Sequence, residues 1–287
     1  MDNPASGVNN PPVNCYIAPV KRTGQKMRHP PIKQRLEAGE KLNGCWIEMY
    51  HPVASEIIAM SSFDIAFIDL EHGPGSYSDA LCVMQAIRAF PCAPMIRVGS
   101  GDIVDIKRTL DLGPAGIMVP NVQTASEARR TVKACRYGPD GIRGAAPGII
   151  RATDYGTNVE DHLRFMAEDF MLIAQIESRQ AVENIEEIVQ VEGIDMYFIG
   201  PSDLSASLGK IWDFESPEYR DAYARIIETV KAAGKFLGIV PVPGCSLKQQ
   251  YRDGHNLILG DADTMLLKQA AAGNLEKIRE AAASINP

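Results

Sequence analysis

Charged and amide side chains stand at the ends of apolar runs whose composition is typical of buried strands. Burying an unpaired charge is costly, so each of these groups requires an opposite charge, a hydrogen-bond partner or a metal ion. Asp69, Glu71 and His72 lie at or just after the end of the run IAFIDL, and Arg97 lies near the end of PMIRV. Gln175 and Glu177 lie at the end of MLIAQI, and Asp203 follows MYFIG.

Glu177 and Asp203 are the pair best suited to hold a metal ion. They follow neighbouring apolar runs, so a parallel sheet would bring them to one edge at the same height. Two carboxylates with room for waters and substrate oxygens suit Mg²⁺ or Mn²⁺. Either carboxylate alone could equally form a salt bridge or a helix cap. Together with Arg97 and His72 at the same end, they predict a divalent-metal site.

Arg97 would be a fixed cation in such a site. It could bind a substrate oxygen whose negative charge grows during the reaction. The alternative is a structural ion pair with Asp69 or Glu71. His72 could carry a proton, because a histidine titrates near neutral pH, and Asp69 beside it would orient its ring.

Three further positions extend the predicted site. Residues two apart on a strand share a face, so Gln175 should point the same way as Glu177, and Glu71 the same way as Asp69. The turn Gly-Pro-Ser-Asp is expected to lead into a helical segment, and the backbone N–H groups around Ser202 could hold a carboxylate or a phosphate. Trp46, at the end of the first apolar run, is either core or a wall of the substrate site.

The elements that must position these residues alternate along the chain. Eight apolar runs separated by amphipathic stretches favour a closed (β/α)₈ TIM barrel over an open doubly wound sheet. The strands are expected at Gly44–Met49, Ile65–Leu70, Pro94–Val98, Gly116–Val119, Met171–Ile176, Met196–Ile199, Phe236–Val240 and Leu257–Leu259. The helices are expected at Pro52–Ser61, Tyr77–Ala89, Ile103–Leu112, Ala125–Cys135, Ala181–Val189, Pro217–Ala233, Cys245–Asp253 and Thr264–Ser284, with Ser76, Asp102 and Thr124 as N-caps.

Two segments fall outside this alternation. Residues 1–30 are rich in Pro and Asn and are expected to form an extended N-terminal arm, ahead of a single barrel domain over 31–287. The connection Arg136–Asp169 is unusually long and rich in glycine and proline. Such loops are usually functional, so it is expected to shape a ligand site or a subunit contact.

Composition narrows the class of function. The chain has 287 residues, 45% of them hydrophobic, and a net charge of −7. No basic stripe indicates nucleic-acid binding. No segment approaches the ~20 apolar residues of a membrane span, and the N-terminus lacks a signal-peptide layout. Six cysteines without metal-binding spacing are expected to be free thiols of a cytoplasmic protein.

These residues resemble a known family, the HpcH/HpaI aldolases or class II pyruvate aldolases. The resemblance extends from about Ile32 to the C-terminal helix. The matching stretches are GCWIEMYHPVASEIIAMSSFDIAFIDLEHGP, PMIRV, IKRTLDLGPAGIMVPNVQTASEARRTVKACRYGPDGIRG, AQIESRQAVENIEEIVQVEGIDMYFIGPSDLSASLG and DTMLL.

The resemblance implies a TIM barrel of the phosphoenolpyruvate/pyruvate type, assembled as a hexamer, a dimer of trimers with exchanged C-terminal helices. It implies cleavage or formation of a C–C bond in a 4-hydroxy-2-oxo acid, giving pyruvate and an aldehyde through a pyruvate enolate. The resemblance also implies a role for each residue of the site. Glu177 and Asp203 would hold Mg²⁺, Mn²⁺ or Co²⁺, with Glu71 and Gln175 supporting the metal and its waters. Arg97 would stabilise the enolate, and Asp69 and His72 would move protons. The backbone amides of Ser202 and Asp203 would bind the pyruvate carboxylate, and Trp46 would lie near the substrate.

Three features depart from the family pattern, and all bear on the aldehyde. They are Glu48 near the mouth, the sequence AAPG after Gly144, and Asp261 before the last helix. Two alternatives to the aldolase remain open: decarboxylation of oxaloacetate-type acids through the same enolate, as in macrophomate synthase, and a non-catalytic, oligomeric acid-binding barrel.

Overall fold

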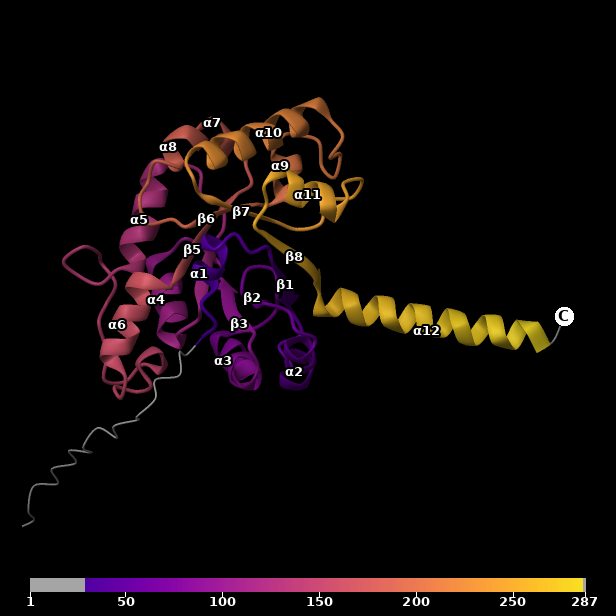
Figure 1. The fold of residues 1–287 in the computed structure, drawn as a ribbon, viewed down its shortest axis with the longest axis horizontal. Coiled ribbons are helices and arrows are strands. Elements are labelled where there is room, and N and C mark those ends of the chain that lie inside the picture. Colours follow the sequence, from indigo (N-terminus) through magenta and orange to yellow (C-terminus); the bar gives the residue numbers. More distant parts are fainter. Residues whose placement is uncertain (1–28, 286–287) are drawn as a thin grey trace, which may run out of the picture.

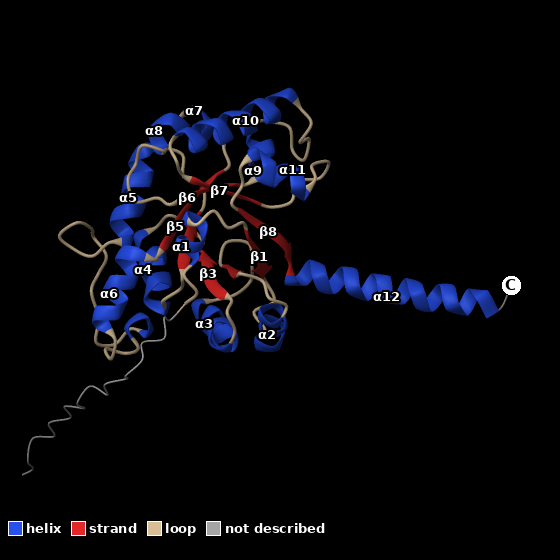
Figure 2. Cartoon of the chain, viewed as in Figure 1, coloured by secondary structure: helices blue, strands red, loops and turns tan. Residues whose placement is uncertain are grey.

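Eight parallel strands close into a barrel in a computed structural model that describes residues 29–285. The strands follow one another around the barrel in chain order, from β1 to β8, and β8 pairs with β1. Figure 2 shows the strands at the centre and most of the helices around them. The prediction of a (β/α)₈ barrel is therefore confirmed.

The strands lie close to the predicted ranges. The bounds are β1 Leu42–Ile47, β2 Ile65–Asp69, β3 Ala93–Arg97, β4 Gly116–Val119, β5 Met171–Ile176, β6 Met196–Ile199, β7 Phe236–Ile239 and β8 Leu257–Ala262.

The first strand, β1, was expected to run to Met49 but ends at Ile47. The backbone N–H groups of Glu48 and Met49 donate to the carboxylate of Asp263, at the start of the last helix. These two N–H groups are therefore taken by a side chain and do not extend the strand pairing.

The helices follow the predicted order with three additions. They are α1 Ile32–Glu37, α2 Pro52–Met60, α3 Tyr77–Ala86, α4 Ile103–Leu112, α5 Ala125–Cys135, α6 Val159–Glu168, α7 Arg179–Glu183, α8 Ile185–Ile188, α9 Pro201–Ser207, α10 Pro217–Ala232, α11 Leu247–Asp253 and α12 Asp263–Ile285. Ser76, Asp102 and Thr124 each accept a backbone N–H as N-caps, as predicted.

Of the three added helices, α1 and α6 were not predicted, whereas α9 begins at the Gly-Pro-Ser-Asp turn that was expected to lead into a helical segment. The long connection Arg136–Asp169 contains α6, so it is not the continuous loop that was expected. The predicted helix Ala181–Val189 is divided in two at Asn184, whose side-chain amide donates to the backbone carbonyl of Gln123.

Strand alternation directs one set of side chains into the barrel. On β2, Ile65 and Phe67 belong to the interior cluster, whereas Ala66 and Ile68 pack outward against the helices. The next inward position is Asp69. The same alternation on β3 places Ala93 and Met95 inside, with Arg97 above them.

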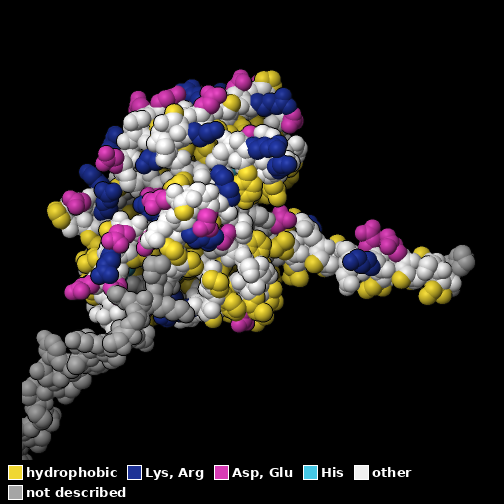
Figure 3. Space-filling model, in the orientation of Figure 1, with side chains coloured by type: hydrophobic (Ala, Val, Ile, Leu, Met, Phe, Trp, Pro, Cys, Tyr) yellow, Lys and Arg dark blue, Asp and Glu magenta, His cyan; other side chains and the backbone are white. Residues whose placement is uncertain are grey.

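The last helix, α12, projects away from the barrel (Figure 1). Of its 23 residues only Asp263 is buried. Figure 3 shows hydrophobic side chains on this helix and on the part of the barrel around α2. The exposed apolar residues of these two helices are Met265, Leu267, Leu275, Ile278 and Ile285 on α12, and Val53, Ile57 and Met60 on α2.

Several sequence expectations concern the ends of the chain and its cysteines. The predicted arm, residues 1–30, lies almost entirely outside the described residues. Within 29–285, five cysteines are free thiols, and Cys15 falls outside that range. Among the same residues, no helix has the length and apolar character needed to cross a bilayer.

Candidate active site at the mouth of the barrel

Arg97 is the centre of the polar cluster at the carboxyl ends of the strands. Its Nε and Nη2 donate to the two carboxylate oxygens of Asp69 at 2.8 and 2.6 Å. Its Nη1 lies 3.0 Å from Oε2 of Glu71. The guanidinium therefore makes both of the ion pairs that the sequence left as alternatives, and it is held in one orientation.

Asp69 is fully buried and ionised. Burial alone would raise the pKa of this carboxyl, but the two hydrogen bonds and the charge of Arg97 outweigh burial and hold the pKa below its usual range. Asp69 Oδ1 also accepts the backbone N–H groups of Glu71 and His72. The contact with His72 is thus to its backbone, and the ring of this exposed residue is oriented by no described bond from Asp69.

Glu71 pairs with the same arginine, but its pKa is shifted in the opposite direction from that of Asp69. Burial raises the pKa of its carboxyl, and the charges of Asp69 and Asp203 add to that effect while Arg97 opposes it. Glu71 therefore holds a proton more readily than Asp69 does.

Trp46 forms the floor beneath Arg97. The guanidinium carbon lies 4.6 Å from the centre of the indole ring, within the range of a cation–π contact. The indole packs at 5.0 Å against Phe67 and meets Phe198 edge-on at 6.3 Å. Trp46 is thus both core and wall, because its ring closes the apolar interior and supports the cation at the mouth.

Glu177 lies across the mouth in a fixed position. The backbone N–H of Asn121 donates to Oε1 at 2.8 Å, and the side-chain amide of Gln175 donates to Oε2. A side chain at position 200 would collide with Oε2, so Gly200 provides the space for this carboxylate.

The electrostatics of Glu177 favour a cation. Burial raises the pKa of this carboxyl to about 7; the hydrogen bond from Gln175 opposes the rise, and the negative charges of Asp203 and Glu71 add to it. Asp203 is therefore close enough to Glu177 to repel it, as expected for two carboxylates that face one ion. A nearby divalent cation would remove that repulsion.

The donor set fits a hard divalent ion that keeps several waters. Among residues 29–285, no group of three or more His, Cys, Asp and Glu side chains is arranged to hold a metal. Two carboxylates leave the remaining positions of an Mg²⁺-like ion to water and substrate oxygens. The buried Oε1 of Gln175 also has no hydrogen-bond partner in the described structure, which leaves it available to a water or ligand here.

α9 begins at Pro201, shortly after β6, and Ser202 and Asp203 lie in its first turn. The helix has no side-chain cap, so no capping side chain occupies the backbone N–H groups of that turn. The structure thus brings all the predicted site residues to one end of the barrel: Trp46, Asp69, Glu71, His72, Arg97, Gln175, Glu177, Ser202 and Asp203.

Two site residues were missed by sequence reasoning. Asn121 has φ 52°, a left-handed conformation in which its N–H reaches Glu177. Tyr50 also has positive φ, and its hydroxyl donates to the backbone carbonyl of Asp69. An asparagine after a proline was the only signal for the first, because asparagine tolerates this conformation. No pattern indicated the second.

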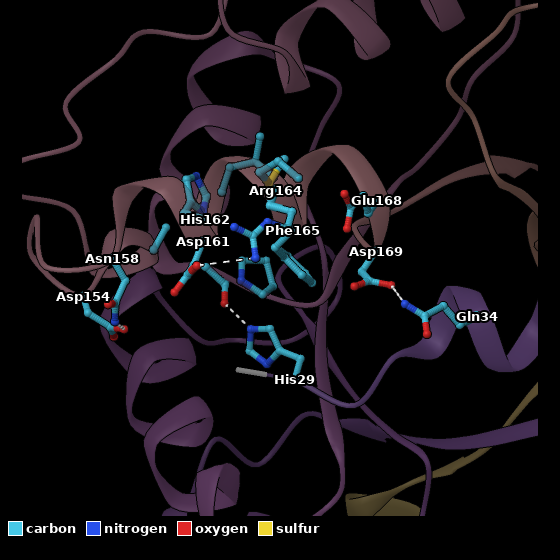
Figure 4. A pocket seen from close by; sticks show the side chains of 15 residues that line it. His29, Gln34, Asp154, Asn158, Asp161, His162, Arg164, Phe165, Glu168 and Asp169 are labelled. Carbon is cyan, nitrogen blue, oxygen red and sulfur yellow. Dashed lines mark hydrogen bonds and ion pairs between the residues drawn. The ribbon is translucent and has the colours of Figure 1, made fainter. Parts of the chain in front are cut away.

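Two of the cavities lie at different places on the barrel. One of about 490 Å³ adjoins the mouth and is lined by Glu71, residues 99–103, Asn121 and Arg130. The other, of about 320 Å³, lies on the flank beside α6 (Figure 4). It is lined by His29, Arg164 and Phe165 among others, and none of the predicted site residues borders it.

Comparison with known proteins gives the same family by sequence and by structure. The family model for "HpcH/HpaI aldolase/citrate lyase" matches residues 42–270. A hydroxypyruvate/pyruvate aldolase of Delftia acidovorans is 40% identical, over 87% of this chain and 92% of the relative. A 4-hydroxy-2-oxo-heptane-1,7-dioate aldolase of Shigella sonnei is 35% identical, over 89% and 97%. A solved HpcH/HpaI aldolase/citrate lyase family protein from Burkholderia cenocepacia superposes with a TM-score of 0.82 at 33% identity, over 87% of this chain and 99% of that one.

Proposed function

The chain belongs to the HpcH/HpaI aldolase/citrate lyase family, and from this premise we propose that it is a metal-dependent aldehyde-lyase. It would cleave or form a C–C bond of a 4-hydroxy-2-oxo acid, with pyruvate and an aldehyde as the other side of the reaction. The observation that supports the proposal is the arrangement of three charged side chains at the mouth. Arg97 is held by an ion pair with Asp69, and the two carboxylates of Glu177 and Asp203 lie close enough to repel each other.

Glu177 and Asp203 would hold the divalent ion, and Mg²⁺, Mn²⁺ and Co²⁺ are the candidates. When bound, such an ion acts as a Lewis acid on the keto oxygen of pyruvate and lowers the cost of forming its enolate. Gln175 fixes one Glu177 oxygen and the Asn121 backbone fixes the other, so these two groups set where the carboxylate presents its lone pairs.

Arg97 would bind the oxygen on which negative charge develops. Asp69 and Glu71 hold three of its nitrogen atoms, and Trp46 lies under its plane. A cation held in this way needs no reorganisation during the reaction, which is the condition under which such a group stabilises a transition state most.

His72 would move the proton, because it is exposed at the mouth and its backbone is anchored to Asp69. Glu71 would assist as a nearby carboxyl whose pKa is raised by burial. The amides of Ser202 and Asp203 would receive the pyruvate carboxylate, since anions are favoured at the first turn of a helix.

Exchange of the pyruvate methyl protons with D₂O tests this proposal without requiring the natural aldehyde. We expect exchange with added Mg²⁺, Mn²⁺ or Co²⁺, and its loss with EDTA. Glu177→Gln and Asp203→Asn should abolish exchange while keeping the circular dichroism spectrum of the folded protein. Metal-independent exchange, or full exchange in both variants, would contradict the assignment of the site.

Decarboxylation of an oxaloacetate-type acid is the second candidate, because it would pass through the same enolate and use the same residues. Release of CO₂ from oxaloacetate, compared with release of pyruvate from 4-hydroxy-2-oxo acids, separates the two. A much larger kcat/KM for oxaloacetate would favour the decarboxylase.

We further propose that α12 packs against a second copy of the chain. Five apolar side chains on this helix are exposed in the single chain, which is unusual for a soluble helix unless a partner covers them. A hexamer is the assembly that we expect.

A further inference from the structure

Glu48 is the first residue past the end of β1, two positions after Trp46, whose side chain points inward. Leu42 and Trp46 lie in the interior cluster, and Cys45 and Ile47 pack outward. The strand ends at Ile47, and the bond from Thr264 keeps Glu48 at the rim where β1 and β8 end. The side chain is half-buried there.

The carboxylate of Glu48 is held in place by the start of α12. The hydroxyl of Thr264 donates to Oε2 at 2.9 Å. The backbone N–H of Glu48 donates to Asp263, which also accepts the N–H groups of Met49 and Thr264. Both the backbone and one oxygen of Glu48 are thus fixed, and Oε1 has no bond described within residues 29–285.

The surroundings of Glu48 are acidic. Burial raises the pKa of the neighbouring Cys45 thiol to about 12, and the charges of Asp263, Asp261 and Glu48 add to that effect. Arg97, the cation of the candidate site, is engaged by Asp69 and Glu71. Among the described residues Glu48 makes no ion pair, so no described cation neutralises the negative charge at this part of the rim.

We propose that Glu48 determines which aldehyde the enzyme accepts. Its carboxylate accepts a hydrogen bond from a hydroxyl group of the aldehyde and repels an aldehyde that carries a carboxylate. The preferred partner is therefore a neutral, hydroxylated aldehyde. This inference rests on the proposed aldolase function and specifies its substrate class.

The names of the relatives do not indicate which aldehyde this chain accepts, because they specify different substrates. One at 40% identity is named for pyruvate and hydroxypyruvate, and another at 35% identity is named for a dicarboxylic acid. Cleavage of a dicarboxylic substrate of that kind releases an aldehyde that bears a carboxylate, and Glu48 disfavours such an aldehyde here.

A matched pair of aldehydes tests the proposal. Succinate semialdehyde and 4-hydroxybutanal have the same carbon chain and differ in ending as a carboxylate or a hydroxymethyl group. The measurement is the ratio of their kcat/KM values in condensation with pyruvate. We expect the wild type to prefer 4-hydroxybutanal and Glu48→Gln to reduce that preference about tenfold or more, because the amide removes the like charge and keeps the shape.

Salt provides a readout that a purely structural role would not change. The wild-type preference should weaken as NaCl is raised, since a partly exposed charge is screened. In Glu48→Gln the remaining preference should not respond to salt. Glu56→Gln is the matched control, because Glu56 is an exposed carboxylate on α2, and it should leave the ratio unchanged.

The possible outcomes separate this inference from the proposed function. No pyruvate proton exchange in the wild type would overturn the aldolase assignment itself. Exchange in the wild type with an unchanged ratio in folded Glu48→Gln would overturn only the role of Glu48. If that variant does not fold, Thr264→Val releases the carboxylate instead and should shift the ratio in the same direction; an unchanged ratio there would also overturn the role.

Discussion

Arg97 is the residue on which most contacts of the site converge. Asp69 and Glu71 neutralise it from the side, and Trp46 lies beneath it. Its position could be predicted from the sequence as a cation ending an apolar strand. Its two ion pairs could not, because Asp69 and Glu71 were equally placed candidates. In the structure β2 ends at Asp69, and the following turn brings Glu71 to the same guanidinium.

We expect Arg97→Ala to reduce pyruvate proton exchange by about 10²-fold, the scale for losing one oxyanion donor. The variant should also unfold at a lower temperature, because buried Asp69 loses its counter-charge. Arg97→Lys separates the effects: it should restore part of the melting temperature and little of the exchange, since a lysine cannot form the same paired hydrogen bonds. Equal recovery of both would argue against a role for the guanidinium in the reaction.

Asn121 acts on the metal site through Glu177. Its left-handed backbone directs the N–H to Oε1, so a residue that avoids this conformation should displace the carboxylate. We expect Asn121→Val to weaken Mn²⁺ binding about tenfold, a typical effect of losing a group that orients a ligand. Asn121→Gly should bind Mn²⁺ within about twofold of the wild type, because glycine adopts positive φ readily. Titration followed by the electron paramagnetic resonance of free Mn²⁺ measures both, and equal affinity in the valine variant would contradict the role.

At the scale of elements, the alternation of strands and helices could be predicted from the sequence, because buried parallel strands appear as continuous apolar runs. β4, β5 and β6 have the predicted bounds. The errors have tertiary causes. β1 stops at Ile47 because Asp263, which is distant in the sequence, takes the next two N–H groups. β8 continues to Ala262 because that residue pairs with Trp46.

The segment before β8 gives the barrel an acid-sensitive element. His255 is fully buried, its Nε2 lies 2.9 Å from the hydroxyl of Tyr223, and its Nδ1 has no hydrogen-bond partner among the described residues. Burial lowers the pKa of this histidine from 6.5 to about 4. The unfolded chain therefore takes up the proton first, and the stability that neutral His255 contributes is present above pH 6.5 and is lost as the pH falls toward 4.

We expect the free energy of unfolding to decrease between pH 6.5 and pH 4, with up to about 3 kcal/mol of the loss due to His255. Urea unfolding at several pH values, with EDTA present, measures it. His255→Gln should have a flatter pH dependence than the wild type. His51→Asn is the control, because His51 is an exposed helix cap and asparagine can replace it in that role. Parallel curves for wild type and His255→Gln would disprove the contribution of His255.

At the scale of the whole molecule, the exposed α12 is the feature that a single chain does not explain. Its 23 residues would extend roughly 35 Å at about 1.5 Å per residue. The sequence predicted the helix, since its residues are good helix formers. What covers its apolar side chains could not be predicted from periodicity, which identifies an apolar face but not its partner.

We expect the double variant Leu275→Asp, Ile278→Asp to have a lower molar mass than the wild type by light scattering. Two charges on an apolar face disfavour burial against another copy of the chain. Lys277→Gln, on the same helix, should keep the wild-type mass. A wild-type protein that is monomeric at micromolar concentration would contradict the proposed assembly.

Asp263 links the end of β1 to the start of α12. One buried carboxylate terminates the first strand and begins the last helix, and the next residue, Thr264, fixes the side chain that we propose to discriminate between aldehydes. In the assembly that we propose, a displacement of α12 by a neighbouring copy would therefore also move Thr264 and Glu48 at the rim of the barrel. We expect dilution that dissociates the proposed assembly to reduce the preference between the two aldehydes at protein concentrations where turnover is still retained.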